Sequence, residues 1–365
     1  DGGEPCLGVV LEYAEPADAP KPAPVFAAAT AAATTAGTAS KSAPGDKCVL
    51  GVIGAGAFAR SVLLPELRRL PRVELHTIVT TKGADAQHTA GTFGFRAAAA
   101  DSSLVFDNPE INAVLIATRH DSHAELTALA LEAGKSVLVE KPLALSREEL
   151  ARVTDAREGS AGFFQIGFNR RFAPMAVAVR DLLAGVTGPK FVILRINAGA
   201  VPGDSWVNDS DKSGGRILGE MCHFVDLARF FVGQPIRSVH ADAAKAPAAA
   251  DDVSAMLRFA DGSLATIAYT GLGDAALGKE LVEAYGGGQV IRMNNFMELT
   301  IAANGKSRTE KASRKNKGFA AALRAFTDAV IVGGPAPVPE AELMETSIAT
   351  IAILESLGSG ARVDL

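Results

Sequence analysis

A glycine-rich turn between an apolar run and a helical pattern constrains the fold of this chain more than any other stretch. The apolar run at residues 49–53 leads directly into Gly54-Ala-Gly56, and a helical pattern covers residues 58–70. This order is typical of a buried parallel strand, a tight turn and a helix start that together hold the pyrophosphate of a dinucleotide. Gly54 permits the turn, Gly56 lets backbone N–H groups approach a phosphate, and the helix N-terminus favours negative charge. An ordinary glycine-rich turn is the alternative. The predicted cofactor contacts here are Gly54, Gly56, Ala57 and Phe58.

Strand and helix patterns alternate from residue 49 to about residue 165. Strands are predicted at residues 49–53, 73–80, 113–118, 136–139 and 163–168, with helices at 85–93, 122–133 and 146–156. Ser146 and Glu149 have the spacing of a capping box at the start of the last of these helices. Because alternating strands and helices indicate a doubly wound parallel sheet, we predict a dinucleotide-binding Rossmann domain over residues 46–168.

The pattern changes after residue 168 to longer strands with fewer helices between them. A helix at 174–183 is followed by strands at 191–197, 238–242, 253–259, 263–269, 280–285, 290–293 and 297–301. Asp261-Gly262 and Gly286-Gly-Gly288 are turn signals between such strands. We therefore predict, over residues 169–365, an α/β domain with an open, mostly antiparallel sheet. Helices at 216–231 and 319–332 are expected to cover this sheet, and a helix at 340–357 to close the domain.

The first 45 residues have a different composition. Residues 6–13 could form one strand, whereas residues 15–45 are rich in Ala, Pro, Thr and Ser with almost no large apolar side chain. Such a segment cannot bury enough surface to offset its ordering entropy, so we predict a linker. The chain begins at Asp1 without a signal-peptide pattern, and we expect a processed product or a fragment.

Charge and composition exclude several classes of partner. The net charge is −5, which gives no electrostatic case for nucleic acid or an anionic membrane, and there is no run of about 20 uncharged apolar residues that would span a bilayer. Cys6, Cys48 and Cys222 are too widely separated for a zinc site and suit a reducing compartment. We therefore expect a cytoplasmic protein without a bound metal.

Polar residues follow the second and third strands, at the sheet edge where such folds bind ligands. Thr80-Thr81-Lys82 lacks the acidic residue that often binds the adenosine ribose, and its hydroxyls and lysine could accept a 2′-phosphate, which favours NADP over NAD. The alternative is that Lys82 is an ordinary surface lysine, and His123 could equally be structural. The predicted cofactor contacts at this edge are Thr80, Thr81, Lys82, Thr118, Arg119, His120 and His123.

Two further stretches carry candidate catalytic groups. Glu140-Lys141-Pro142 ends the fourth strand, where Glu140 could contact the cofactor and Lys141 could hold a substrate hydroxyl and stabilise negative charge on it. Glu220, His223 and Asp226 are spaced by threes and would share one face of an α-helix. Carboxylates beside a histidine can orient its ring and tune its pKa, so His223 is a candidate base. A strand-end charge pair and a structural histidine are the alternatives.

The order and spacing of Gly54-Ala-Gly56, Glu140-Lys141-Pro142 and Gly215…His223-Phe-Val-Asp226 resemble the glucose–fructose oxidoreductase and inositol dehydrogenase family (GFO/IDH/MocA) over about residues 47–357. The resemblance implies NAD(P)-dependent oxidation or reduction of a secondary alcohol on sugars, inositols or sugar nucleotides. It also implies a C-terminal sheet that mediates homo-oligomerisation, a substrate-orienting Lys141 and an acid/base His223. The family usually has Asp four residues before its histidine. Gly219 stands there in this chain, and Glu220 is expected to substitute.

A narrower resemblance is carried by the stretches at residues 118–123, 167–172 and 219–226. They look like the family branch fused behind a zinc-type medium-chain alcohol dehydrogenase module, which would make residues 6–13 the last strand of that module. We expect Glu220 or Asp226 to contact His223 or Lys141. The alternatives to a dehydrogenase are a non-catalytic dinucleotide-binding sensor or scaffold, and an enzyme that interconverts two sugars with retained NADP. The predicted catalytic residues are Lys141, His223 and Glu220, and the predicted substrate contacts are Asn169, Arg170, Trp206 and Asp226.

Overall fold

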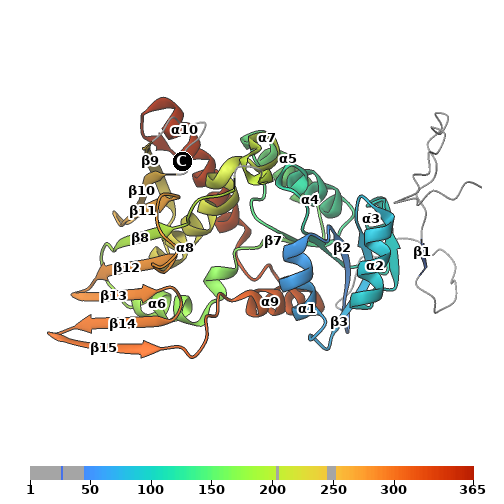
Figure 1. Ribbon diagram of the computed structural model, residues 1–365, viewed down its shortest axis with the longest axis horizontal. Coiled ribbons are helices and arrows are strands. Elements are labelled where there is room, and N and C mark those ends of the chain that lie inside the picture. Colours follow the sequence, from blue (N-terminus) through green and yellow to red (C-terminus); the bar gives the residue numbers. More distant parts are fainter. Residues whose placement is uncertain (1–25, 28–44, 203–204, 245–251) are drawn as a thin grey trace, which may run out of the picture.

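Two sheets, each with its own covering of helices, organise the chain (Figure 1). The computed structural model describes residues 26–27, 45–202, 205–244 and 252–365. The predicted strand at residues 6–13 lies outside the described residues, and the fused module that depends on it stays a prediction. Phe26–Ala27, inside the predicted linker, forms a short strand β1 that pairs with Ala97 and Ala98, which the sequence did not predict.

The first sheet has seven strands in the order β1-β4-β3-β2-β5-β6-β7, and all pairings except that of β1 are parallel. The strand order reverses between β2 and β5, which in such sheets is where a ligand crevice opens. The prediction of a parallel, doubly wound sheet is confirmed. The strands are β2 (Cys48–Ile53), β3 (Val73–Val79), β4 (Ala97–Ala99), β5 (Ala113–Ile116), β6 (Ser136–Val139) and β7 (Phe164–Ile166).

Helices cover both faces of this sheet, as its uninterrupted apolar strands require. One face packs against α1 (Leu64–Leu67), α2 (Gly83–Phe93) and α9 (Phe319–Val332), and the other against α4 (His123–Glu132), α5 (Arg147–Arg157) and the first half of α10 (Glu340–Ser359). A short helix α3 (Ser103–Phe106) lies between β4 and β5. The predicted capping box on α5 is present, because Ser146 Oγ accepts from Glu149 N and the Glu149 carboxylate accepts from Leu145 N.

The second sheet has nine strands in the order β15-β14-β13-β12-β8-β11-β10-β9-β16, and only the β8–β11 pair is parallel. The prediction of a mostly antiparallel sheet is confirmed. One face packs against α6 (Pro174–Ala184), α8 (Cys222–Val232) and the second half of α10. The strands are β8 (Phe191–Asn197), β9 (Ile236–Ala243), β10 (Val253–Phe259), β11 (Leu264–Thr270), β12 (Glu280–Gly286), β13 (Gln289–Asn294), β14 (Glu298–Ala303), β15 (Lys306–Lys311) and β16 (Val363–Asp364).

The position of α9 differs from the prediction. Leu323, Phe326 and Ile331 of this helix pack in the same cluster as Leu50 of β2, so α9 covers the parallel sheet and not the antiparallel one. The expectation that residues 319–332 cover the second sheet is therefore wrong. The predicted domain boundary at residues 168–169 stays a prediction. After β15 the chain returns to the first sheet, so each sheet with its helices is not one continuous stretch of sequence.

Candidate functional site

The glycine turn lies at the carboxyl end of β2, beside the point where the strand order reverses. Gly54 has φ +93°, and a Cβ atom there would lie 2.5 Å from the carbonyl oxygen of Ala117 at the end of β5. Only glycine fits this position. At Gly56 a Cβ atom would meet nothing within 4 Å, so the backbone there borders open space. The turn therefore has both the tight approach and the room that a dinucleotide pyrophosphate requires.

Two further predicted cofactor contacts lie beside the turn. Ala57 and Phe58 begin the helical segment that follows it, and Phe58 is 40% exposed with its ring 5.6 Å from that of Phe319 in α9. This segment is π-helical over Ala59–Leu63 before it continues as α1. Helix starts leave backbone N–H groups without intrahelical acceptors, which suits an anionic ligand.

The end of β3 presents the hydroxyls and the lysine predicted to favour NADP. Thr80 Oγ1 donates to the carbonyl of Lys82 at 2.7 Å, and Thr81 and Lys82 are exposed just before α2. The first acidic side chain in α2 is that of Asp85, in its first turn. The strand end thus carries an accessible cation and no carboxylate.

Two histidines in the segment after β5, His120 and His123, have different surroundings. His123 is 1% exposed, with its ring nitrogens 2.7 Å from the Pro142 carbonyl and 3.3 Å from the Thr118 carbonyl. Burial lowers the His123 pKa to about 4 against these contacts, so the ring is neutral and its single N–H can donate to only one of the two carbonyls. The contact with Pro142 ties the ends of β5 and β6 together. The predicted cofactor contact by His123 is therefore wrong. Thr118 is half-buried and bonded to Ser122, while Arg119 is exposed at the same edge.

His120 joins the parallel sheet to the segment that carries Gly219. Its Nδ1 lies 2.7 Å from the Ser213 carbonyl, and its ring packs 4.9 Å from that of Trp206. Burial, followed by the charge of Lys141, holds the pKa of His120 at about 4, against the contact with Ser213 that raises it. Trp206 is 39% exposed. His120 is thus an uncharged side chain that borders the site. Trp206 is partly exposed, and its predicted contact with substrate stays a prediction.

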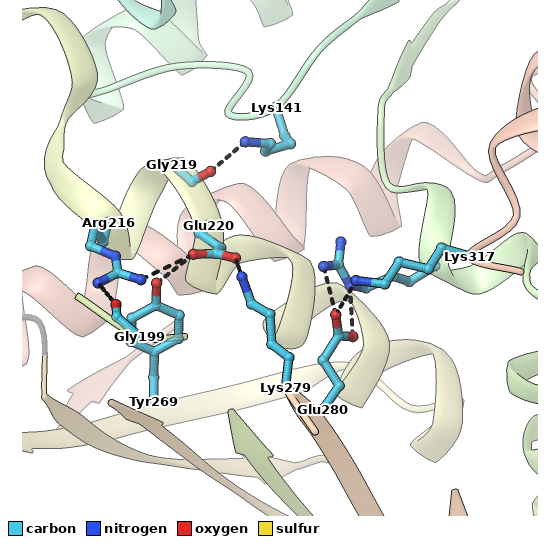
Figure 2. Close-up of polar contacts among 10 residues, drawn as sticks. Lys141, Gly199, Arg216, Gly219, Glu220, Tyr269, Lys279, Glu280 and Lys317 are labelled. Carbon is cyan, nitrogen blue, oxygen red and sulfur yellow. Dashed lines mark hydrogen bonds and ion pairs between the residues drawn. The ribbon is translucent and has the colours of Figure 1, made fainter. Parts of the chain in front are cut away.

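Lys141 reaches from the end of β6 to the other half of the molecule. Its Nζ donates to the Gly219 carbonyl at 2.5 Å, a contact drawn in Figure 2. The Glu140 side chain lies over Gly167 at the end of β7, where a Cβ atom would come within 2.8 Å of its carboxylate. Burial raises the Glu140 pKa to about 7, opposed by the neighbouring charge of Lys141. These two residues close the carboxyl edge of the parallel sheet.

His223 lies four residues after Gly219, in the first turn of α8. It is buried, its ring is 6.0 Å from that of Phe168, and its Nδ1 has no hydrogen-bond partner in the described part of the chain. Burial lowers the His223 pKa well below its usual value, and four nearby cations lower it further. These cations, in decreasing order of effect, are Arg170, Lys141, Lys317 and Lys279. At neutral pH His223 is therefore a neutral imidazole that can accept a proton.

Glu220 faces away from His223 and Lys141. One carboxylate oxygen accepts from the Tyr269 hydroxyl at 2.5 Å and lies 3.5 Å from Arg216, while the other forms an ion pair with Lys279 (Figure 2). Although burial opposes ionisation of Glu220, Lys279 and the other partners bring its pKa down to about 2. The expected contact of Glu220 with His223 or Lys141 is wrong. The segment Ile217–Met221 is π-helical, so Glu220 and His223 do not share the face that α-helical spacing predicts.

Two other predicted substrate contacts are held in buried ion pairs. Asp226 is 0% exposed and bonds both carboxylate oxygens to Arg171, at 2.5 and 3.1 Å. It contacts neither His223 nor the site, and its assignment as a substrate contact is wrong. Arg170 is buried and bonds Glu280 through two contacts of 3.0 Å, made by its Nε and Nη2, and its predicted substrate contact stays a prediction.

Asn169 is bonded on one side only. Its Nδ2 donates to the Lys317 carbonyl at 2.7 Å, while its buried Oδ1 has no partner within the described ranges. Buried polar atoms normally have a hydrogen-bond partner. Asn169 Oδ1 and His223 Nδ1 are therefore two places where a bound ligand or water would complete the bonding.

Two family profiles match this chain, one for each sheet. Residues 49–168 match the profile of an oxidoreductase family with an NAD-binding Rossmann fold, and residues 189–286 match that of the GFO/IDH/MocA C-terminal domain. The chain belongs to the GFO/IDH/MocA oxidoreductase family. The predicted resemblance is thus confirmed, and with it the assignment to oxidoreductases that carry an NAD-binding Rossmann fold.

Relatives of this GFO/IDH/MocA protein include named dehydrogenases. Levoglucosan dehydrogenase of Pseudarthrobacter phenanthrenivorans is 31% identical over 220 residues, 51% of this chain and 56% of that enzyme. Myo-inositol 2-dehydrogenase of Thermotoga maritima is 27% identical over 60% of this chain and 67% of that enzyme. A structure of levoglucosan dehydrogenase with NADH and levoglucosan is similar in fold, with a TM-score of 0.77 and 24% identity over 87% of this chain and 99% of that one.

The departure from the family pattern at Gly219 has a steric reason. A Cβ atom on Gly219 would lie 2.9 Å from His120 Cε1, so the His120 ring occupies the space that an aspartate side chain would need. Lys141 instead bonds the backbone carbonyl of Gly219. In this member of the family, a carbonyl oxygen therefore stands opposite the lysine at this position.

Three polar residues of the site were not predicted from the sequence. Tyr269 in β11, Lys279 just before β12 and Lys317 just before α9 all lie near His223 or Glu220. They are 46 or more residues from His223 in the chain and belong to no motif. The pairing of β8 with β11 and β12 brings Tyr269 and Lys279 to the start of α8, and the return of the chain to α9 brings Lys317 there, so no sequence signal could have identified them.

The described ranges contain neither a metal-binding group of side chains nor a membrane-spanning helix. No group of three or more His, Cys, Asp or Glu side chains there is arranged to hold a metal ion. None of the helices in the same ranges combines the length and the apolar character needed to cross a bilayer.

Proposed function

We propose that this protein is an NAD(P)-dependent dehydrogenase or reductase that acts on a secondary alcohol of a sugar, inositol or sugar nucleotide. The observation that carries the proposal is the hydrogen bond from Lys141 Nζ to the Gly219 carbonyl, because it brings the lysine of the parallel sheet to the segment that leads into His223. The glycine turn, with open space at Gly56, lies at the same edge of that sheet. The relatives named as sugar and inositol dehydrogenases support the substrate class.

In this mechanism Lys141 and His223 divide the work on one hydroxyl. Lys141 donates a hydrogen bond to the substrate oxygen and stabilises negative charge that develops on it. His223 accepts the hydroxyl proton during oxidation and returns it during reduction, which should contribute about 10²- to 10⁴-fold to the rate. A nicotinamide cofactor bound at the glycine turn would exchange the hydride with the carbon that carries this hydroxyl. Because its surroundings keep His223 neutral, the resting protein is ready for the oxidation direction.

Variants of the two residues test this proposal. Lys141→Met and His223→Ala should each lower kcat/KM by at least about 10²-fold while cofactor affinity changes less than about threefold, because neither side chain is needed to hold pyrophosphate. Turnover is measured by NAD(P)H absorbance over a panel of sugars, and affinity by calorimetric titration. Exposed Lys306 of β15 provides the matched control as Lys306→Met. Undiminished turnover in either site variant would contradict the proposal.

Two rival functions give different results in the same assays. A sensor or scaffold would bind the dinucleotide but turn over none of the sugars. An enzyme that interconverts two sugars would keep its NADP through gel filtration, and would show turnover only when an oxidisable and a reducible sugar are both present. The paired positions of Lys141 and His223 favour the dehydrogenase, since a pure binding module has no need for both.

The finer features of this function are also part of the proposal. We propose a preference for NADP, supported by the accessible Lys82 and the absence of an acid at Thr80-Thr81-Lys82. A cytoplasmic location is supported by the buried free thiols of Cys48 and Cys222, which suit a reducing compartment.

Homo-oligomerisation through the second sheet is the remaining proposal about assembly. On its outward face Phe191 pairs in register with Leu264 on one side and Tyr285 on the other. Phe191 and Met256 are each 41% exposed on this face. Adjacent exposed apolar side chains of this kind mark interaction surfaces. Light scattering of the purified protein tests the assembly, and a monomer at micromolar concentration would contradict it.

A further inference from the structure

The side chains around His223 include more positively charged groups than carboxylates that pair with them. Arg170, Lys141, Lys317 and Lys279 all lie close enough to lower its pKa. Glu280 is shared by two of these cations, since it bonds Arg170 at 3.0 Å and Lys317 at 2.6 Å. Lys279 is paired with Glu220, which also serves Arg216 and Tyr269. The remaining cation, Lys141, donates to a carbonyl. Four cations are thus matched by the carboxylates of Glu220 and Glu280.

Other acidic groups do not restore the balance. Asp226 is consumed by its ion pair with Arg171. Glu140 lies beside Lys141, but burial raises its pKa to about 7, so it carries only part of a charge at neutral pH. The surroundings of His223 therefore keep an excess of positive charge.

Two of these cations are more accessible than the acid Glu280. The Lys279 and Lys317 side chains are 34% and 22% exposed, whereas those of Glu280 and Arg170 are 2% and 6% exposed. Both lysines come from segments that directly precede secondary structure, Lys279 before β12 and Lys317 before α9. Figure 2 shows Lys279 and Lys317 on either side of Glu280, below Lys141. The two lysine side chains are therefore partly accessible to solvent, whereas the Glu280 side chain is not.

We propose that the substrate carries an anionic substituent, a carboxylate or a phosphate, and that Lys279 and Lys317 receive it while Lys141 holds the reacting hydroxyl. This inference rests on the proposed function and specifies its substrate class. Ammonium groups bind carboxylate and phosphate oxygens through charge-assisted hydrogen bonds, which are stronger than bonds to a neutral hydroxyl. A neutral sugar would leave the excess positive charge uncompensated in a partly buried site.

An anionic substrate would also suit the chemistry of His223. A nearby negative charge stabilises the protonated form of a histidine. The bound substrate would therefore offset part of the excess positive charge and help His223 to hold the proton that it takes from the hydroxyl. The free protein keeps His223 neutral, and the complex makes it a better proton acceptor.

Matched sugars test the proposal in the cofactor-loaded protein. We compare glucose with glucuronate and glucose 6-phosphate, and galactose with galacturonate and galactose 6-phosphate. The anionic member of a pair should have a kcat/KM at least about tenfold higher, and Lys279→Met or Lys317→Met should lower the anionic-to-neutral ratio of kcat/KM by about tenfold. Preference for the uronate or the phosphate identifies the anion. Lys306→Met is the control.

A second measurement decides the inference if no sugar is turned over. Inorganic phosphate is titrated into protein saturated with NADH, so that the pyrophosphate site is filled, and binding is followed by NADH fluorescence. Phosphate affinity that falls about tenfold in Lys279→Met and Lys317→Met supports an anion site, even though the absence of turnover would count against the proposed function. Phosphate binding that is absent, or unchanged in both variants, overturns the inference. Turnover of neutral sugars as efficient as that of anionic ones also overturns it and leaves the dehydrogenase intact.

Discussion

Two glycines of one turn should respond to substitution in opposite ways. At Gly54 a side chain meets both a positive φ of +93° and the Ala117 carbonyl oxygen 2.5 Å from the new Cβ. At Gly56 the new Cβ meets nothing within 4 Å, and φ is not in the left-handed region. Gly54→Ala therefore destabilises the folded protein, whereas Gly56→Val only places a side chain in the open space beside the turn.

The expected losses follow from these contacts. Backbone strain at a positive φ costs about 1–3 kcal/mol, and overpacking against a rigid backbone costs about the same again. Relief of the Gly54→Ala clash would separate β2 from β5, where Ala117 N donates to Ile53 O at 2.8 Å. We expect Gly54→Ala to lower the free energy of unfolding by at least about 2 kcal/mol. Gly56→Val should change it by less than about 0.5 kcal/mol but weaken cofactor binding at least about 100-fold, or about 2.7 kcal/mol.

Denaturant unfolding and calorimetric titration with NADH and NADPH measure the two effects on the same preparations. Gly56→Ala is the matched control, because it adds one methyl group at the site where Gly56→Val adds a branched side chain. It should be as stable as the parent protein and intermediate in cofactor affinity. Equal destabilisation by Gly54→Ala and Gly56→Val would refute the reasoning about the turn. Unchanged cofactor affinity in Gly56→Val would show that the pyrophosphate does not bind beside Gly56.

Two further predictions concern cofactor choice and acid stability. Lys82→Ala should weaken NADPH binding by about tenfold and NADH binding by less than about twofold, and NADH binding more than about tenfold tighter than NADPH in the parent protein would reject the NADP preference. Burial lowers the pKa of His120 and His123 to about 4 and that of His223 well below 6.5, so the unfolded chain binds three more protons at these groups as pH falls below 6.5. Glu140, with its pKa raised to about 7, offsets one of them between pH 7 and 4.5. As the pH is lowered from 6.5 to 4.5, the free energy of unfolding should therefore decrease by up to about 2.7 kcal/mol per pH unit. A free energy of unfolding that does not change over this range in denaturant titrations would contradict the burial of these histidines.

Local sequence patterns were sufficient for five of the seven strands of the first sheet and for most of the second sheet, whereas the short strands β1 and β4 were not predicted. Buried parallel strands such as β2 and β5 are short apolar runs bounded by turns, so the sequence reveals them directly. The turns at Gly262 and at Gly287-Gly288 have positive φ, as their sequences predict. By contrast, β15 (Lys306–Lys311) was missed because all six of its residues are exposed, and a strand without a buried face has no alternating apolar pattern.

The composition of the site was less predictable than the fold. Lys141 and the glycine turn lie where strand ends place them, since the carboxyl ends of parallel strands meet at one edge. The orientation of Glu220 depends on a π-helical turn, which α-helical spacing cannot anticipate. Its true partners, Tyr269 and Lys279, come from strands or loops far along the chain.

By itself, the sequence determined the family, the parallel sheet and the residues that follow its strands, because these depend on local order along the chain. Only the tertiary structure decided which charges surround His223. Lys279 and Lys317 reach it through the pairing of the second sheet and through the return of α9 to the first, and Asp226 is withdrawn from it by Arg171. Electrostatic balance depends on distances between groups that are remote in sequence, and burial strengthens those interactions, so no local pattern could encode it.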